Sequence, residues 1–144
     1  MKVLIQRVKQ ASVTIENTLY SQIDKGYLIF LGIEKEDSED KIEWLVNKIL
    51  NLRIFENDEG KMTHSIIDVQ GEILLVSQFT LCGNCKKGNR PSFDNAMLPK
   101  EAEILYEKFI NVLSKNITVK TGSFGAMMDV ALINDGPVTF MIEK

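Results

Sequence analysis

The sequence predicts one α/β domain, with a strand-rich sheet or barrel-like core and two amphipathic helices packed outside it. Two observations support this architecture: apolar runs of strand length recur along the 144 residues, and two longer segments carry apolar residues at helical spacing. A hydrophobic content of 44% with 26% charged residues suits one packed core. No repeat, linker or low-complexity segment divides the chain, so we expect a single domain over residues 1–144.

The first part of the chain predicts four strands. Lys2–Val8 is the first, and the alternation in Ala11–Ile15 predicts a neighbouring strand. Glu16–Thr18 offers a turn, after which Leu19–Ile23 returns as a short strand. Tyr27–Ile33 is nearly all apolar, which predicts a central strand that is buried on both faces.

Two segments predict the helices. Asp37 or Ser38 is expected to cap the first helix, and Pro99 to start the second, which runs to about Ser114. Apolar residues follow helical spacing in both. The apolar face of the first helix is Ile42, Leu45, Val46, Ile49 and Leu50, and that of the second is Ala102, Leu105, Tyr106, Phe109, Ile110 and Leu113.

The remaining segments predict shorter strands and one polar loop. Arg53–Phe55 is expected to be a short strand before a turn, and Ile73–Leu81 a stronger one that leads into a polar loop over Cys82–Asn95. The final strands are expected over Thr118–Thr121, Met128–Asn134 and Val138–Ile142.

Charge and composition exclude several classes of protein. A net charge of −3 argues against a chain wrapped broadly in nucleic acid, although a local basic patch is compatible with it. No apolar run approaches the roughly 20 residues that span a bilayer, so we expect no membrane association. The apolar start of the chain is short and lacks a cleavage site, and there are only two cysteines, so we expect a cytoplasmic protein.

Familiar catalytic and cofactor motifs are missing. The one histidine, His64, lies among loop residues and is interpreted as a surface residue. No glycine-rich phosphate-binding loop is present, so we expect no nucleotide cofactor. Cys82 and Cys85 form a CxxC pair, but a structural zinc needs four ligands and a redox pair favours a helix start. We therefore expect no metal and no cofactor, and keep a CxxC redox or metal protein as a minor alternative.

The densest basic stretch follows the predicted strand that ends at Leu81. Lys86, Lys87 and Arg90 lie in it, and Phe93 follows them. Such a stretch is either a solvated loop or a loop that contacts phosphates, with the aromatic ring available for packing or stacking. Its position directly after a candidate site motif favours contact with RNA.

Two short motifs lie at the ends of predicted strands. Ser77-Gln78-Phe79-Thr80-Leu81 ends one strand, and Asn134-Asp135-Gly136-Pro137-Val138-Thr139 precedes the last one. Taken alone, the first is an ordinary polar and apolar alternation, and the second is ordinary turn chemistry. Together, in this order and at this separation, the pair resembles the signature of the D-aminoacyl-tRNA deacylases.

The resemblance extends over essentially the whole chain. It includes Val3–Val8 with Ala11–Val13 (similar to the family's opening hairpin), Lys48–Phe55, Gly60–Met62, Gly122–Met128, and the basic segment with Lys87, Gly88, Arg90, Pro91, Ser92 and Phe93. It implies a hydrolase that removes D-amino acids, with glycine as a further candidate, from the 3′-terminal adenosine of mischarged tRNA and rejects L-aminoacyl-tRNA. It also implies a homodimer with active sites at the interface.

The resemblance also implies residue roles. Ser77, Gln78 and Thr80 are expected to be catalytic residues and, with Phe79, to line the pocket for the aminoacylated adenosine. The Gly136–Pro137 bond is expected to be cis, to be held by Arg7 and to enter the partner subunit's pocket. Thr80 is a candidate nucleophile in the family; the alternative is attack by water, assisted by the 2′-hydroxyl of the tRNA and by backbone N–H groups near Phe79 and Thr80.

A second class of function remains open from the sequence. The alternative is a non-catalytic nucleic-acid-binding module on the same fold. Such a module would not need Gly136-Pro137 beside Gln78 and Thr80, and it would favour a more positive net charge.

Overall fold

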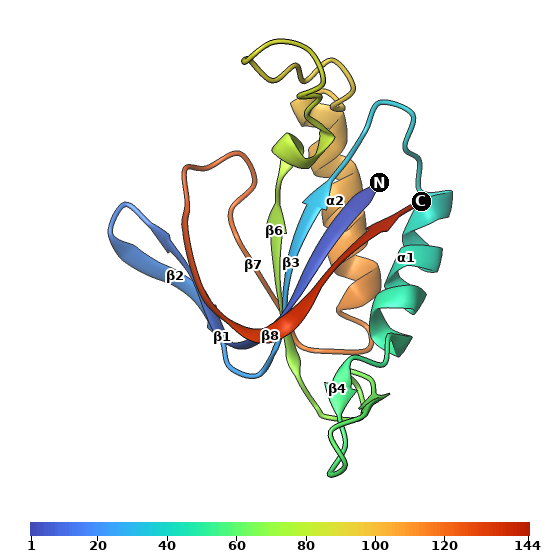
Figure 1. Cartoon of the computed structure of the whole chain (residues 1–144). Helices are drawn as coiled ribbons and strands as arrows, with labels where there is room; N and C mark the ends of the chain where they lie inside the picture. The colour runs from blue at the N-terminus through green and yellow to red at the C-terminus, as the bar shows by residue number, and fades with distance from the viewer.

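A curved six-stranded sheet forms the centre of the molecule, and both helices lie on the same side of it (Figure 1). The computed structural model describes every residue from Met1 to Lys144. Hydrogen bonds join the strands in the order β2-β1-β3-β6-β7, with β8 on β1, and only the β3–β6 and β6–β7 pairs are parallel. The sheet strands are β1 (Lys2–Ile15), β2 (Thr18–Ile23), β3 (Gly26–Gly32), β6 (Glu72–Ser77), β7 (Val119–Thr121) and β8 (Asp129–Glu143).

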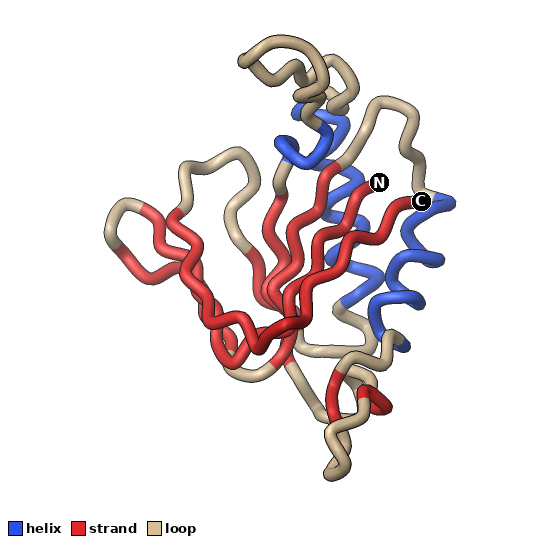
Figure 2. Tube along the Cα trace, viewed as in Figure 1, coloured by secondary structure: helices blue, strands red, loops and turns tan.

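The sheet curls until its two ends nearly meet, as Figure 2 shows. The hydroxyl of Ser21 on β2 donates a hydrogen bond to the carbonyl of Thr121 on β7 over 2.8 Å. This contact joins the first and last strands of the hydrogen-bonded order. The expected barrel-like core is therefore confirmed.

β1 is one continuous strand, whereas the sequence predicted two. Lys9 and Gln10 are exposed, and their polarity interrupts the apolar pattern without ending the strand. Val8 pairs with Asn134 and Gln10 with Ile133, so Lys9 is an extra residue that bends β1. The opening hairpin turns at Glu16 and Asn17, where both residues have positive φ and where the sequence predicted a turn, and not between the two expected strands.

The two helices have the predicted apolar faces. α1 (Asp40–Asn51) buries all five expected residues, and α2 (Pro99–Leu113) buries all of its expected face except Ile110, which is partly buried. Neither helix has the length and apolar character that crossing a bilayer requires.

The expected cap of α1 is wrong. The helix begins after Glu39, which makes no side-chain capping bond. The carboxylate of Asp37 instead accepts hydrogen bonds from the amine of Met1 and from Lys41, at 2.6 and 2.7 Å. Burial by itself would raise the pKa of Asp37, but these bonds, with one from the backbone of Glu34, hold the pKa below its usual value.

Two apolar clusters hold the fold together. The larger lies between the sheet and the helices and contains 23 buried residues, including Tyr27, Phe109 and Val138. The smaller contains seven, including Leu28 and Val76, on alternate positions of the same strands. β3 and β6 thus contribute side chains to both clusters, as expected for central strands.

A small hairpin projects from the lower end of the molecule in Figure 1. It pairs β4 (Phe55–Glu56) with β5 (Met62–His64), where the sequence predicted one strand over Arg53–Phe55. His64 is exposed, as expected, but lies in β5 and not in a loop. The hairpin matters for the site because Ile54 and Glu56 contact Arg7.

Candidate active site

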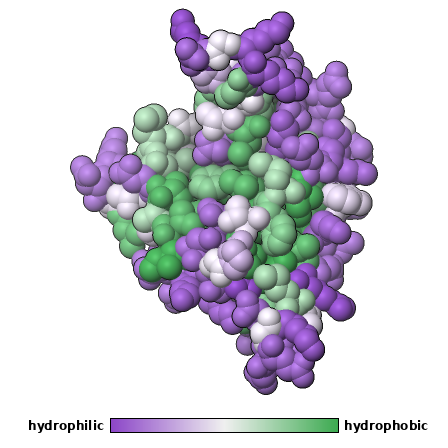
Figure 3. Space-filling model, viewed as in Figure 1, coloured by the Kyte–Doolittle hydropathy of each residue, from purple (hydrophilic) through white to green (hydrophobic).

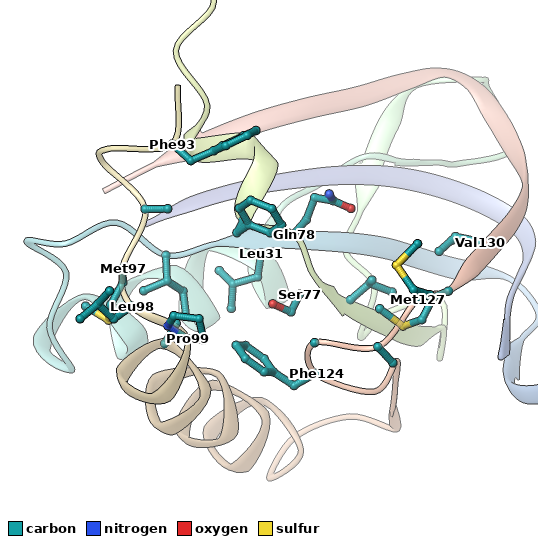
Figure 4. A pocket seen from close by; sticks show the side chains of 18 residues that line it. Leu31, Ser77, Gln78, Phe93, Met97, Leu98, Pro99, Phe124, Met127 and Val130 are labelled. Carbon is teal, nitrogen blue, oxygen red and sulfur yellow. The ribbon is translucent and has the colours of Figure 1, made fainter. Parts of the chain in front are cut away.

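An apolar cavity of about 610 Å³ opens beside the end of β6 (Figure 4). The end of β6, the start of α2 and the loop between β7 and β8 form its walls. Its polar side chains are those of Ser77 and Gln78, and no ionisable side chain lines it. The other lining residues are Leu31, Ile33, Val76, Phe79, Phe93, Ala96, Met97, Leu98, Pro99, Ala102, Phe124, Gly125, Ala126, Met127, Met128 and Val130.

The first signature motif turns away from the sheet at this cavity. The sequence predicted a strand to Leu81, but β6 ends at Ser77 and Phe79–Cys82 form a short 3₁₀ helix, η1. The N–H of Gln78 still donates to the carbonyl of Leu31 over 2.8 Å, which extends the sheet by one bond before the turn. The strand end thus presents Ser77 and Gln78 to the cavity.

Thr80 lies next to the cavity and does not line it. The side-chain amide of Gln78 donates a hydrogen bond to its hydroxyl oxygen. The first backbone bond of η1 is donated by Leu81 to the carbonyl of Gln78. The N–H groups of Phe79 and Thr80 precede this first bond, so neither has an acceptor within the helix.

An aromatic pair links the motif to the basic segment. The rings of Phe79 and Phe93 meet edge to face, with centroids 5.0 Å apart. Gly83 makes this approach possible, because a Cβ there would lie 3.0 Å from the ring of Phe93 and 2.9 Å from the carbonyl of Thr80. Phe93 is therefore a wall of the cavity, in the position where Figure 4 shows it.

The basic loop, with Lys86, Lys87 and Arg90, is exposed and precedes Phe93, which lines the cavity. Reciprocal backbone hydrogen bonds of 2.8 and 3.0 Å between Asn84 and Ser92 close its base. No ion pair in the structure involves these three cations. Their charge is thus available to an external anion.

The two cysteines have different environments. Cys82 is buried, its thiol contacts the carbonyl of Ile33, and burial raises its pKa. Cys85 is exposed, and both thiols are free. The CxxC pair therefore does not form a disulfide in this structure.

Arg7 contacts the second signature motif from a buried position. Its Nε donates to the carbonyl of Asp135 over 3.2 Å and lies 2.9 Å from the carboxylate of the same residue. Its other nitrogens donate to the carbonyl of Ile54 over 2.6 Å and to the carboxylate of Glu56 over 3.2 Å. One guanidinium thus ties the β4–β5 hairpin to the residue that precedes Gly136.

The Gly136–Pro137 bond is cis, as expected. It lies within β8, which continues on both sides of it, whereas the sequence predicted two strands separated here. Gly136 and Pro137 are exposed and are not part of the cavity wall of their own chain. Within one chain, the structure therefore brings together Ser77, Gln78 and Phe79, and separately Arg7 and Asp135, but it does not bring these two groups together.

Sequence reasoning missed two walls of the cavity. Met97–Pro99 form one of them and Phe124–Met128 form another. The second has a visible signal, because Met127 is 91% exposed on a loop where Gly125 has a φ of 72°. Met127 is one of several apolar residues that together line this cavity, and a contiguous apolar surface of this kind is typical of a binding site.

Comparisons with known proteins agree with the motif pair. The family model described as D-Tyr-tRNA(Tyr) deacylase matches residues 4–143. A D-aminoacyl-tRNA deacylase of Thermodesulfovibrio yellowstonii is 58% identical, over 99% of this chain and 98% of that relative. One of an Exiguobacterium species is 56% identical, over 100% of this chain and 99% of the relative.

Two solved structures share the fold. One, named c-Myc DNA Unwinding Element Binding Protein, is 46% identical with a TM-score of 0.95, over 100% of this chain and 99% of that one. A probable eukaryotic D-amino acid tRNA deacylase has a TM-score of 0.85 at 18% identity, over 98% and 97% of the two chains, and supports the fold alone. With the full-length family match and curated relatives above half identity, this chain belongs to the D-Tyr-tRNA(Tyr) deacylase family.

Proposed function

We propose that this protein hydrolyses the ester that joins a D-amino acid to the 3′-terminal adenosine of tRNA, and that it rejects L-aminoacyl esters. Family membership supports the reaction class. The observation that carries the proposal is the cavity at the end of β6, where the signature residues Ser77, Gln78 and Phe79 form one wall. An apolar cavity with a few polar groups on one side is typical of a small-ligand site.

The chemistry favours assistance by the RNA over a threonine nucleophile. A threonine hydroxyl needs a base to become nucleophilic, and no ionisable side chain lines the cavity. Gln78 only donates to the oxygen of Thr80 and cannot take its proton. An aminoacyl ester is already activated, so its neighbouring 2′-hydroxyl can assist attack by water, while the N–H groups of Phe79 and Thr80 stabilise the developing oxyanion.

A complete site needs a second copy of the chain. Gly136 and Pro137 lie outside the cavity wall of their own chain, yet belong to the signature pair. β8 hydrogen-bonds only to β1 and exposes Ile133, Phe140 and Met141. Figure 3 shows apolar side chains gathered across the middle of the face that β8 crosses. A long, partly apolar edge strand is normally covered, so we propose a homodimer in which each segment enters the partner's cavity.

In this arrangement the main chain of Gly136 and Pro137 occupies the space that an L side chain needs. Glycine lacks Cβ, so its backbone can approach a ligand closely. Main-chain atoms held by the strand on both sides cannot move aside as a flexible side chain can, and this makes rejection by steric exclusion effective.

The basic loop extends the site toward the rest of the tRNA. Its three cations are exposed and lie beside Phe93, which lines the cavity. We propose that they contact phosphates near the 3′ end of the acceptor strand. We also propose a cytoplasmic location, because aminoacyl-tRNA is found in the cytoplasm. The reducing conditions there keep thiols such as those of Cys82 and Cys85 free.

The test compares D- and L-aminoacyl-tRNA of one tRNA and follows the loss of each ester. Rapid loss of the D-ester alone is expected. The same tRNA ending in 2′-deoxyadenosine should lose most of the acceleration, whereas Thr80→Val should keep it. Full activity on the deoxy substrate, together with an inactive Thr80→Val variant, would restore the threonine nucleophile.

A second candidate function has one observation in its favour. The 46% identical structure is named as a DNA-unwinding-element binding protein, which is compatible with a nucleic-acid-binding module. Tight binding of duplex DNA by this protein, with no hydrolysis of either ester, would favour that function. Hydrolysis of the D-ester without such binding would exclude it.

A further inference from the structure

The Gly136–Pro137 segment lies in an enlarged bulge of β8. Gln6 of β1 pairs with Thr139, and Val8 pairs with Asn134. Four residues of β8, Asp135–Val138, therefore lie opposite Arg7 alone. A bulge of this kind interrupts the ladder between two strands, so the carbonyl groups at its margins need other donors.

The side-chain amide of Asn134 supplies that donor on both strands. Its Nδ2 donates to the carbonyl of Arg7 over 2.9 Å and to the carbonyl of Val138 over 3.1 Å. Carbonyl oxygens only accept, so only the nitrogen end of the amide can face both. The other end, Oδ1, lies 3.5 Å from where a Cβ on Gly136 would be. The amide thus closes the base of the bulge.

Two further contacts fix the margins of the bulge. On one side, the guanidinium of Arg7 holds the carbonyl and the carboxylate of Asp135. On the other, Val138 is only 1% exposed and belongs to the larger apolar cluster. The side chain of Asn134 instead joins the two strands at the bulge, because its two acceptors belong to Arg7 on β1 and Val138 on β8.

We infer that Asn134 is a positioning residue: its amide holds the bulge in one place and thereby sets the selection of D- over L-aminoacyl esters. The selection step rests on the proposed function, in which the bulge excludes the L side chain. The holding step, in which Asn134 fixes the position of the bulge, is argued from the hydrogen bonds of its amide and does not depend on the proposed function. The two steps can therefore be measured separately.

The experiment compares Asn134→Ala and Asn134→Asp with wild type. The first removes the donor, and the second keeps the shape but replaces the donor with an acceptor that repels both carbonyls. Gln6→Ala is the matched control, because Gln6 donates across the same two strands to Thr139, outside the bulge. Hydrogen exchange of the 133–141 segment reports the holding step, and the ratio of D- to L-ester hydrolysis reports selection.

Faster exchange in this segment is expected in both Asn134 variants, with a fall of about thirtyfold in the D-over-L ratio, the factor that loss of two ordinary hydrogen bonds implies. Gln6→Ala should change neither readout. Exchange that stays at the wild-type rate overturns the holding step, and an unchanged ratio with faster exchange overturns the selection step. A wild-type protein with no D-over-L preference refutes the proposed function instead.

Discussion

Replacing Arg7 with methionine should destabilise the fold and weaken hydrolysis together. Methionine keeps an apolar stem of similar length and removes the guanidinium, which contacts Ile54, Glu56 and Asp135. The Ile54 residue is 4% exposed, so its carbonyl loses its donor in a place that water does not reach. An unsatisfied buried acceptor of this kind costs about 1–3 kcal/mol.

The two carboxylates add less to this cost. The side chains of Glu56 and Asp135 are 46% and 35% exposed, so water replaces much of what Arg7 provides. Exposed ion pairs contribute about 0–1 kcal/mol each. We therefore expect a loss of about 1–5 kcal/mol, a large fraction of the roughly 5–15 kcal/mol that stabilises a domain.

The assay is urea unfolding at a fixed protomer concentration, because the stability of a dimer depends on concentration. Trp44, the only tryptophan, lies in α1 and provides the fluorescence signal. Lys9→Met is the matched control, since it removes a cation from the exposed position two residues along the same strand. If Arg7→Met unfolded like the Lys9→Met control and hydrolysed the D-ester at the wild-type rate, Arg7 would not support the bulge.

Three further outcomes are expected. Replacing the three cations of the basic loop with glutamine should weaken tRNA binding and flatten its salt dependence while the D-over-L ratio stays constant; an unchanged salt slope would exclude phosphate contacts. Because the folded pKa of Asp37 is lowered, its stabilising effect is present above its ordinary pKa of 3.8 and is lost as the pH falls through the folded value. Urea unfolding of wild type and Asp37→Asn should therefore converge in acid, and a constant difference would contradict this. Iodoacetamide should label Cys85 and spare the buried Cys82 until the protein unfolds, as mass spectrometry can show; early labelling of Cys82 would mean that its cover opens readily.

Periodicity predicted the helices well and the strand ends poorly. The helices each bury a stripe of apolar residues, so spacing alone locates them. The end of β6 is different, because Ser77–Leu81 alternates like a strand while Phe79 is 56% exposed at the cavity. From the sequence alone, an apolar residue that lines a binding site cannot be distinguished from one that packs in the core.

Tertiary contacts account for what the sequence did not predict. The resemblance implied that Arg7 holds Gly136-Pro137, and the structure places Arg7 on Asp135 just before them. The resemblance did not indicate that Arg7 also contacts Ile54 and Glu56, because these contacts depend on how the β4–β5 hairpin folds back. Likewise, turn-forming residues in 134–137 predicted a break between two strands, but pairing with β1 on both sides makes them a bulge.

The bulge also restricts how this protein can vary in length. In a regular strand, Asn134 and Thr139 would point to opposite faces, because they are five positions apart. They pair with Val8 and Gln6, two positions apart on β1, so the bulge corrects the alternation. Deleting or inserting one residue there would change the number of residues that the bulge must absorb for Ile142, which packs against the core, to keep its pairing with Val3. Variation in this segment should therefore take the form of substitution at constant length, even at positions where the side chain itself contacts nothing.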